Sequence, residues 1–521
     1  MQRRILAGIL ILVATGCARG SSDDATREGA NGGGEIDRGW PGDPSGNTPG
    51  SAEQATTKPT TKSLAELGIV PFDVDRNDLA GPDSHEAMYG KLPEIVAVPG
   101  ETFVDVAVRS TDTASGPKTV VVRLEPNAEG VWGITRRFEV KSLGNLLGFA
   151  RSADGHYFYA TGSNDPDVTK TFPAPKQHRS NVVRVVRFDA DGHTSFDVDL
   201  DMARAAANAD AEPIVSPGTA SSARLAVAGN VVALVHGNAT EPDGNGTRHQ
   251  KALSTFLDAG TGAIRNVSSL WVSHSFDQRY VADGSDLYEV HLGDAYPRAT
   301  VLTRVHDGAS GPEQQVYRIK GATGDNNTFT RLGGLARIDA GPAAGGFLTL
   351  VATERTAATS SRINGSRDLG LVRLTSALAN GSSASVVDPN FGTASTVESG
   401  GEQVTNRLHF LTDYHTSSPG KTHAERPKLV PIGGGEFIVL FEQWTISGTQ
   451  QSFKGTFALR IDGNGAIQAA AKQVSQHHLP RGDDAFAYGG GAAWITGNET
   501  TRALTLHRVS RDLGITEHDV Q

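Results

Sequence analysis

The stretch RLAVAGNVVALVHG, residues 224–237, decides the fold. Two apolar runs flank a short Ala-Gly-Asn turn, which is the pattern of a tight β-hairpin. Six other stretches repeat this pattern, each with a turn, usually glycine-rich, between two apolar runs. They are EIVAVPGETFVDVAV (94–108), FARSADGHYFYATG (149–162), RYVADGSDLYEVHLG (279–293), ARIDAGPAAGGFLTLVA (336–352), KLVPIGGGEFIVLF (428–441) and FAYGGGAAWITG (486–497).

A second pattern alternates with the first along the chain. An apolar run closes on Arg and an apolar residue and then enters a turn, as in VVVRLEPNAEG (120–130). LSTFLDAGTG (253–262) fills the same position in the repeat without the arginine. The other copies are VVRVVRFDADG (182–192), QQVYRIKGATG (314–324), LGLVRLTSALANG (369–381), TFALRIDGNG (456–465) and LTLHRVSRDLG (504–514).

The two patterns together define a unit of four strands, with tight turns inside each hairpin and a longer loop between the hairpins. Such a unit, repeated about every 60 residues, is typical of a propeller blade. We therefore predict an all-β chain that forms a β-propeller of seven four-stranded blades. Six or eight blades are the alternatives, because residues 375–427 could hold an irregular eighth unit. An array of β-sandwiches is the rival fold.

Loop length is distributed unevenly between the two rims of this propeller. The tight turns share one rim, and the loops between strands two and three share the other with the blade connections. Nearly all long loops fall in the second group, including residues 162–181, 236–251 and 353–368. Function often lies on loops held by a rigid scaffold, so we predict a functional face at the long-loop rim.

Candidate site residues come from the segment SLWVSHSFDQRYVADGSDLYEVHLGDAYPR (269–298) and the neighbouring loop. Both ends of the inner hairpin of blade four should reach the long-loop rim, near the mouth of the central channel. The predicted ligand-binding residues are His236, His249, His274, Asp277, Arg279, His291, Asp294, Tyr296 and Arg298.

Three interpretations of these residues stay open. They can cap strands and bond to loop backbone, as Asp and Tyr commonly do near turns. They can bind a glycan-like or protein ligand by stacking and paired hydrogen bonds. They can also form a catalytic or divalent-metal site, since imidazole and carboxylate suit both roles. We assign no catalytic residue, metal ligand or cofactor, and favour the binding interpretation.

The first residues resemble the signal peptide of bacterial lipoproteins. MQRR precedes the apolar run ILAGILILVA, which is too short to span a bilayer, and Ala14-Thr15-Gly16-Cys17 resembles a lipobox. The resemblance implies lipidation of Cys17, which is the only cysteine in the chain, so disulfides are excluded. Residues 18–65 have the composition of a disordered tether, and residues 66–521 form the predicted propeller domain.

Composition narrows the class of function further. The net charge is −10 and there is no basic stripe, so nucleic acid is an unexpected partner. No zinc-protease, phosphate-loop or hydrolase-elbow motif occurs, and FDADGH (188–193) lacks a full calcium loop.

The chain as a whole resembles bacterial lipoproteins that carry a β-propeller. That resemblance implies export across the inner membrane and lipid anchoring at the outer membrane or cell surface, and Ala18 after the cysteine fits this location. We predict an envelope-anchored binding module. An envelope hydrolase or lyase acting on a glycan or peptide is the alternative.

Overall fold

The computed structural model describes residues 62–84, 89–111, 118–138, 140, 142–163, 177–218, 221–240, 249–268, 276–293, 297–321, 328–355, 363–382 and 384–520. The predicted signal peptide, Cys17 and residues 18–61 of the predicted tether lie outside these ranges.

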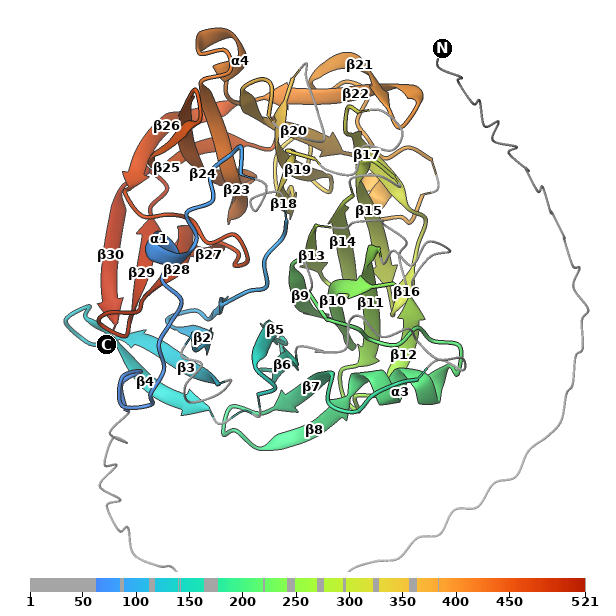
Figure 1. Ribbon diagram of the computed structural model, residues 1–521, viewed down its shortest axis with the longest axis vertical. Helices are drawn as coiled ribbons and strands as arrows, with labels where there is room; N and C mark the ends of the chain where they lie inside the picture. Colours follow the sequence, from blue (N-terminus) through green and yellow to red (C-terminus); the bar gives the residue numbers. More distant parts are fainter. Residues whose placement is uncertain are drawn as a thin grey trace, which may run out of the picture. The chain divides into compact units, whose positions relative to one another are not determined.

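Seven antiparallel sheets are arranged as blades in a ring, which confirms the predicted β-propeller and its blade number (Figure 1). Blade one contains β1 (Ile95–Pro99), β2 (Val104–Arg109), β3 (Thr119–Pro126) and β4 (Trp132–Phe138). Blade two contains β5 (Asn145–Arg151), β6 (Tyr157–Gly162), β7 (Val183–Phe188) and β8 (Thr194–Asp199). Blade three contains β9 (Ala223–Ala228), β10 (Val231–Ala239), β11 (Gln250–Asp258) and β12 (Ile264–Ser268).

The remaining four blades follow in chain order. Blade four contains β13 (Asp277–Asp283), β14 (Asp286–Leu292), β15 (Ala299–His306), β16 (Ala309–Ser310) and β17 (Gln314–Arg318). Blade five contains β18 (Arg331–Arg337), β19 (Phe347–Glu354), β20 (Arg367–Leu374), β21 (Thr393–Ser399) and β22 (Glu402–Phe410). Blade six contains β23 (Thr422–Gly433), β24 (Glu436–Ser447), β25 (Gln450–Asp462) and β26 (Ile467–Ser475). Blade seven contains β27 (Phe486–Tyr488), β28 (Gly491–Asn498), β29 (Ala503–Val509) and β30 (Ile515–Val520).

Short helices accompany the blades. They are α1 (Val74–Asn77), α3 (Leu200–Ala207), α4 (Tyr414–Ser417) and the 3-10 helix η1 (Ser376–Leu378). The side chain of Asp199 caps α3 by accepting a hydrogen bond from the backbone N–H of Met202. In the part of the chain that the structure describes, no helix combines the length and apolar character needed to cross a membrane.

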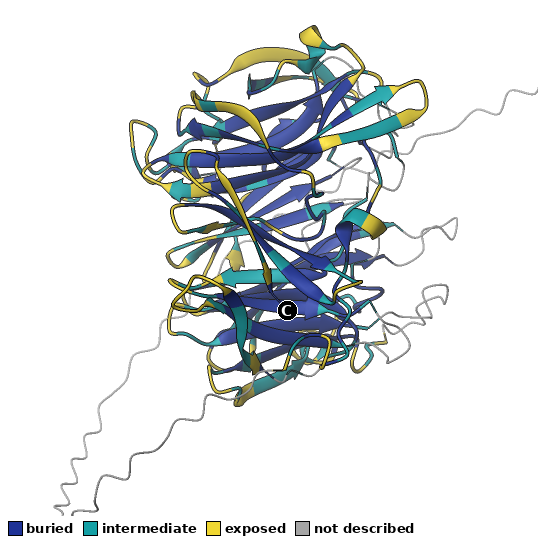
Figure 2. Ribbon diagram, turned by 90° about the vertical axis from the view of Figure 1, so that its left-hand side faces the viewer, coloured by how far each residue is buried: buried dark blue, intermediate teal, exposed yellow. Residues whose placement is uncertain are grey.

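The core lies between neighbouring blades. Every residue of β10 is buried, because both faces of a middle strand pack against other blades and a continuous apolar run satisfies both. One buried cluster joins Phe158 and Val183 of blade two to Val232 and Leu234 of blade three. Figure 2 shows buried residues along the strands and exposed residues mainly at the turns and outer edges.

Strand one of each blade lies innermost, and these strands contact one another in the order β1, β5, β9, β13, β18, β23, β27 and back to β1. Blade seven consists entirely of C-terminal strands, so the ring closes without exchanging a strand between its ends. The segment before β1 strengthens that junction. Leu64, Leu67 and Ile69 pack in one cluster with residues of blades one and seven.

Two details differ from the sequence prediction. In blade four, we placed the outer tight turn after Arg318, whereas the structure places it at Asp307 and Gly308, both with positive φ. The run QQVYR is therefore strand four instead of strand three, and it pairs with β15. Residues 375–427 hold no eighth blade among the described residues. They contain η1 and the hairpin β21–β22, which extends the edge of blade five.

Candidate functional site

The central channel contains two neighbouring cavities towards the short-turn rim. The larger, about 1110 Å³, is lined by β13, β18, β23 and residues 484–485, and reaches Asp283, Asp339 and Pro431 beside the tight turns. The second, about 580 Å³, is lined mainly by β1, β5, β9 and residues 482–484. The two cavities share Asp484 and Tyr280, so they meet on the axis of the ring.

A layer of charged side chains lies at the base of these cavities. Arg224 donates two hydrogen bonds to the carboxylate of Asp484, Nε to Oδ2 at 2.7 Å and Nη2 to Oδ1 at 3.1 Å. Arg279 Nε lies 3.1 Å from Oδ1 of the same carboxylate, and Arg279 also pairs with Asp277. Lys428 donates from Nζ to the main-chain oxygen of Asp483. We call Arg224, Arg279, Lys428 and Asp484 the charged layer.

The two acidic groups beside the channel have opposite pKa shifts. Burial opposes ionisation of Asp484, but Arg224, Arg279 and Lys428 hold the pKa of its carboxyl well below the usual range. Burial raises the pKa of Asp483, although its carboxylate accepts hydrogen bonds from the backbone N–H groups of Glu94 and Ile95. Asp484 is thus a fixed negative charge, and 46% of its side-chain surface is accessible, facing the cavities.

Repetition of the blade explains why cations gather here. In three of the blades, a cation lies the same number of residues before the positive-φ glycine of the inner hairpin. The pairs are Arg224 and Gly229, Arg279 and Gly284, and Lys428 and Gly433, while β18 of blade five opens on Arg331. The three pairs belong to blades three, four and six, and Arg331 belongs to blade five, which lies between blades four and six in the ring. The sequence carries this signal in RLAV, RYVA, RLGG and KLVP, which we did not recognise as a channel lining.

The other end of the channel is covered by the described parts of the segment before β1, residues 71–84 and 89–93, which we call the strap. It contacts the long-loop sides of blades seven, six, five and four in turn (Figure 1). Asp78 anchors it through ion pairs with Arg481 at 2.8 Å and Arg426 at 3.5 Å. The larger cavity therefore faces the short-turn rim, opposite the rim on which we predicted the functional face.

The predicted site residues separate into three groups. Asp277 and Arg279 lie in the channel, and His249 lies at the start of β11, where its carbonyl accepts from Thr240 N–H at 2.8 Å. Three others are buried inside blades and do not project at the rim. They are His236, His291, whose Nε2 lies 2.7 Å from Glu289 Oε1, and Arg298, whose Nε donates to Lys320 O at 3.0 Å. His274, Asp294, Tyr296 and Cys17 lie outside the described residues.

Burial removes His236 from solvent and lowers the pKa of its ring to about 4, with its Nδ1 donating to Gly237 O at 2.9 Å. The folded state favours the neutral ring of His236. The contribution of this ring to stability is therefore complete above pH 6.5 and is lost as the pH falls through 4. This predicts an acid-dependent loss of about 3 kcal/mol. Urea unfolding at pH 7 and pH 4 should show His236→Leu less acid-sensitive than the parent. His193→Leu, at an exposed ring, is the surface control, and its free energy of unfolding should fall between pH 7 and pH 4 by as much as that of the parent.

One turn brings possible cation ligands together. Asp189, Asp191 and His193 each offer one ligand atom, and these three atoms lie within 4.8 Å of one another. Among the described residues, this is the group of His, Cys, Asp or Glu side chains close enough together to hold a metal ion. The carboxylate of Asp189 already accepts from the backbone N–H groups of Asp191 and His193, at 2.8 and 2.9 Å. These bonds account for the three residues as parts of a tight turn in FDADGH.

No protein-family model and no curated protein matches the sequence. Several solved structures resemble the chain, at low identity. A xylan β-1,4-xylosidase from Bacillus halodurans C-125 is 14% identical, with 64% of this chain and 56% of that chain covered and a TM-score of 0.28. The β-propeller domain of the Trilobed protease from Pyrococcus furiosus is 9% identical, with 83% and 93% covered and a TM-score of 0.35. A protein from Lactobacillus plantarum is 10% identical, with 80% and 95% covered and a TM-score of 0.43.

The chain spans just over half of the length of that xylosidase. At this identity and these TM-scores, the likenesses carry no argument about activity. The function of the channel therefore has to be argued from its own residues.

Proposed function

We propose that this chain is a ligand-binding β-propeller that takes a polar, hydroxyl-rich ligand, such as the end of a glycan, into its channel from the short-turn rim. The observation that carries the proposal is Asp484, an accessible carboxylate held by two arginines at the base of a cavity of about 1110 Å³. Without its open mouth, the cavity offers about 450 Å³ to the centre of a water molecule, which lies within the range of small-molecule sites. Carboxylate and guanidinium groups together accept and donate the charge-assisted hydrogen bonds that orient hydroxyl groups.

The lining of the cavity supports an oriented ligand. Gly333 and Gly334 lie at a register shift in β18, where the backbone of the inner strand is exposed to the channel without side chains. Apolar surface from Leu335 and Pro431 lies on the same side. A ligand would thus contact a charged base, an apolar stretch of wall, and the carboxylates of Asp283 and Asp339 nearer the short-turn rim.

The alternative function is an envelope hydrolase or lyase. A reaction needs an acid and a base that reach the substrate. Of the two carboxyls at the channel, Asp483 is buried and engaged by two backbone N–H groups, and Asp484 is engaged by arginines. His236 and His291 of the predicted cluster lie inside blades. These positions favour binding over catalysis.

The binding proposal is tested by titrating chito-, malto- and xylooligosaccharides into the purified chain with calorimetric detection. Asp484→Asn removes one charge-assisted acceptor and should weaken binding of the recognised sugar by about tenfold or more. Asp197→Asn is the matched control, since Asp197 also pairs with an arginine, Arg184, but in the outer strands of blade two. The proposal fails if no oligosaccharide binds, or if the two variants bind equally well.

We also propose that the mature chain is lipid-anchored at Cys17 in the bacterial envelope, with its membrane contact made through that anchor. The support is the lipobox-like Ala14-Thr15-Gly16-Cys17 behind a short apolar run. Cys17→Ser should move the protein from the membrane to the soluble fraction in a cell fractionation experiment. If the variant sediments with membranes like the parent, another feature anchors the chain.

A further inference from the structure

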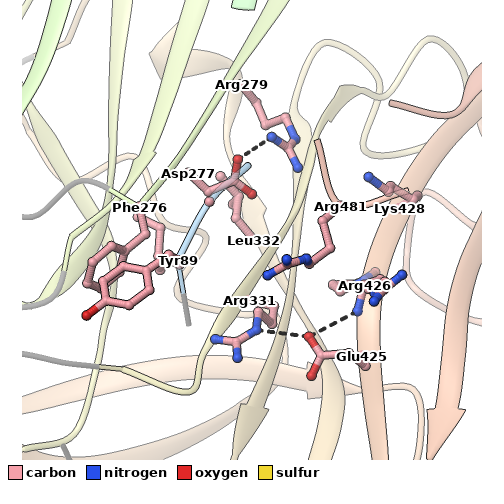
Figure 3. A pocket seen from close by; sticks show the side chains of 13 residues that line it. Tyr89, Phe276, Asp277, Arg279, Arg331, Leu332, Glu425, Arg426, Lys428 and Arg481 are labelled. Carbon is pink, nitrogen blue, oxygen red and sulfur yellow. Dashed lines mark hydrogen bonds and ion pairs between the residues drawn. The ribbon is translucent and has the colours of Figure 1, made fainter. Parts of the chain in front are cut away.

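A third cavity lies on the long-loop side of the charged layer and beneath the strap. It contains about 450 Å³ of empty space when its open mouth is included, and we call it the chamber. Arg279 and Lys428 line both the chamber and the larger channel cavity, which places the charged layer between the two. The chamber uses different walls from the proposed glycan site. Figure 3 shows Tyr89 and Phe276 on one side of it and Arg331, Arg426 and Arg481 on the other.

Arg331 carries the strongest indication of a ligand in the chamber. The residue is 9% exposed. Its Nε donates to Glu425 Oε1 at 2.9 Å, and its Nη1 donates to the carbonyl oxygens of Thr328 and Thr330 at 3.2 Å. Its Nη2 is buried and has no hydrogen-bond partner in the described part of the chain. Burying a guanidinium N–H without a hydrogen-bond partner costs free energy. The geometry of Arg331 therefore leaves one N–H donor that an acceptor on a bound ligand could satisfy.

The charges around Arg331 also favour a negative ligand. Arg331 and the fully buried Arg367 share the single carboxylate of Glu425. Arg426 pairs with Asp78 and Glu442, and Arg481 pairs with Asp78 as well. Asp277 also lines the chamber and pairs with Arg279. Because Arg331 shares the carboxylate of Glu425 with Arg367, a negative charge placed at Arg331 Nη2 would stabilise this guanidinium group.

The opposite wall of the chamber is aromatic and apolar. The rings of Tyr89 and Phe276 meet edge to face, with centroids 5.4 Å apart, and Leu292 and Leu332 also line the cavity. Gly90 fixes the strap here, since a Cβ atom on it would lie 1.7 Å from Phe276 O. Tyr89 is therefore held against the chamber by the close approach of two backbones. A ligand that fits both walls has an anionic head and an apolar or aromatic body.

We propose that the chamber binds a small organic monoanion, an aromatic carboxylate or a close relative, with its carboxylate on Arg331 and its ring beside Tyr89 and Phe276. The strap supplies one wall of the site, so ligand binding also fastens the strap to blade four. This inference does not depend on the glycan proposal, because no experiment on Asp484 changes Arg331 Nη2 or the aromatic wall.

The test uses sodium benzoate as the probe, titrated into the full chain by calorimetry and in thermal unfolding. Benzoate should bind with a stoichiometry of about one and raise Tm with concentration, as expected for a ligand of the native state. Arg331→Gln should lower the affinity by at least tenfold. Arg337→Gln, near the other end of the same strand and largely in the open, is the matched control and should bind like the parent.

Three further measurements test which features of benzoate and of the chamber determine binding. Tyr89→Ala removes one of the two rings of the aromatic wall and leaves Arg331 in place. It should weaken benzoate binding several-fold, and it tests the proposal even if Arg331→Gln does not fold. Benzyl alcohol, with the ring but no charge, should not bind. Inorganic phosphate should bind more weakly than benzoate. The proposal is overturned if benzoate does not bind, if the Arg337→Gln and Arg331→Gln variants bind it equally, or if Tyr89→Ala binds it as the parent does. It is also overturned if benzyl alcohol binds, or if phosphate binds more strongly than benzoate.

Discussion

Replacing Ile69 with alanine is expected to lower the free energy of unfolding by about 2–5 kcal/mol, the cost of emptying a buried isoleucine site. Ile69 is fully buried in a cluster with Ile95 and Val104 of blade one and Ile495 and Leu504 of blade seven. Among the strands that the structure describes, none crosses between the first and last blades, so this apolar cluster is a principal contact that keeps the ring closed. The loss should therefore open the junction between these blades.

Urea unfolding measures the predicted loss, and limited proteolysis within residues 62–93 tests where the chain opens first. Ile467→Ala is the control, because Ile467 is half exposed on an outer strand and its loss should change stability by no more than about 0.5 kcal/mol. If Ile69→Ala is no more destabilising than Ile467→Ala, the segment before β1 does not hold the ring together.

The blades could be predicted from the sequence because their signals are local. In RYVADGSDLYEVHLG, a turn glycine and two apolar runs define β13 and β14 within fifteen residues, and the structure pairs them as expected. The reliance on local signals also explains why the prediction misplaced the outer hairpin of blade four. Few apolar residues follow its turn at Asp307–Gly308. The more regular stretch QQVYR was therefore predicted to be the strand before the turn.

The site could be predicted only in small part, because its contacts are not local. Arg224 and Asp484 meet across the channel although 260 positions separate them. Their contact follows from which residues of each inner strand face the axis, and that register depends on where every hairpin turns. The histidines at strand ends suggested a site at the rim, yet His236 and His291 are fully buried inside blades. The strap shows no repeat at all, so nothing in its sequence places it over the long-loop end.

The buried carboxylate between two arginines predicts the second large effect. Glu425 on β23 is 1% exposed, and its two oxygens bond to Arg331 of β18 and Arg367 of β20. It therefore links blade six to two strands of blade five. Glu425→Gln keeps the shape of the side chain but removes the carboxylate that these two guanidinium groups share. Breaking such a buried pair is expected to lower the free energy of unfolding by about 3–5 kcal/mol.

Glu402→Gln provides the matched control for this prediction. Glu402 also pairs with an arginine, Arg318 at 3.2 Å, but 69% of its side-chain surface is exposed, so its loss should cost at most about 1 kcal/mol. Urea unfolding of both variants at pH 7 gives the comparison, and a double-mutant cycle with Arg331→Met isolates the coupling between Arg331 and Glu425. Equal costs for the two glutamates would mean that water reaches the Glu425 pair. In that case, the buried and shared pairing of Arg331 that motivates an anion in the chamber would lose its physical basis.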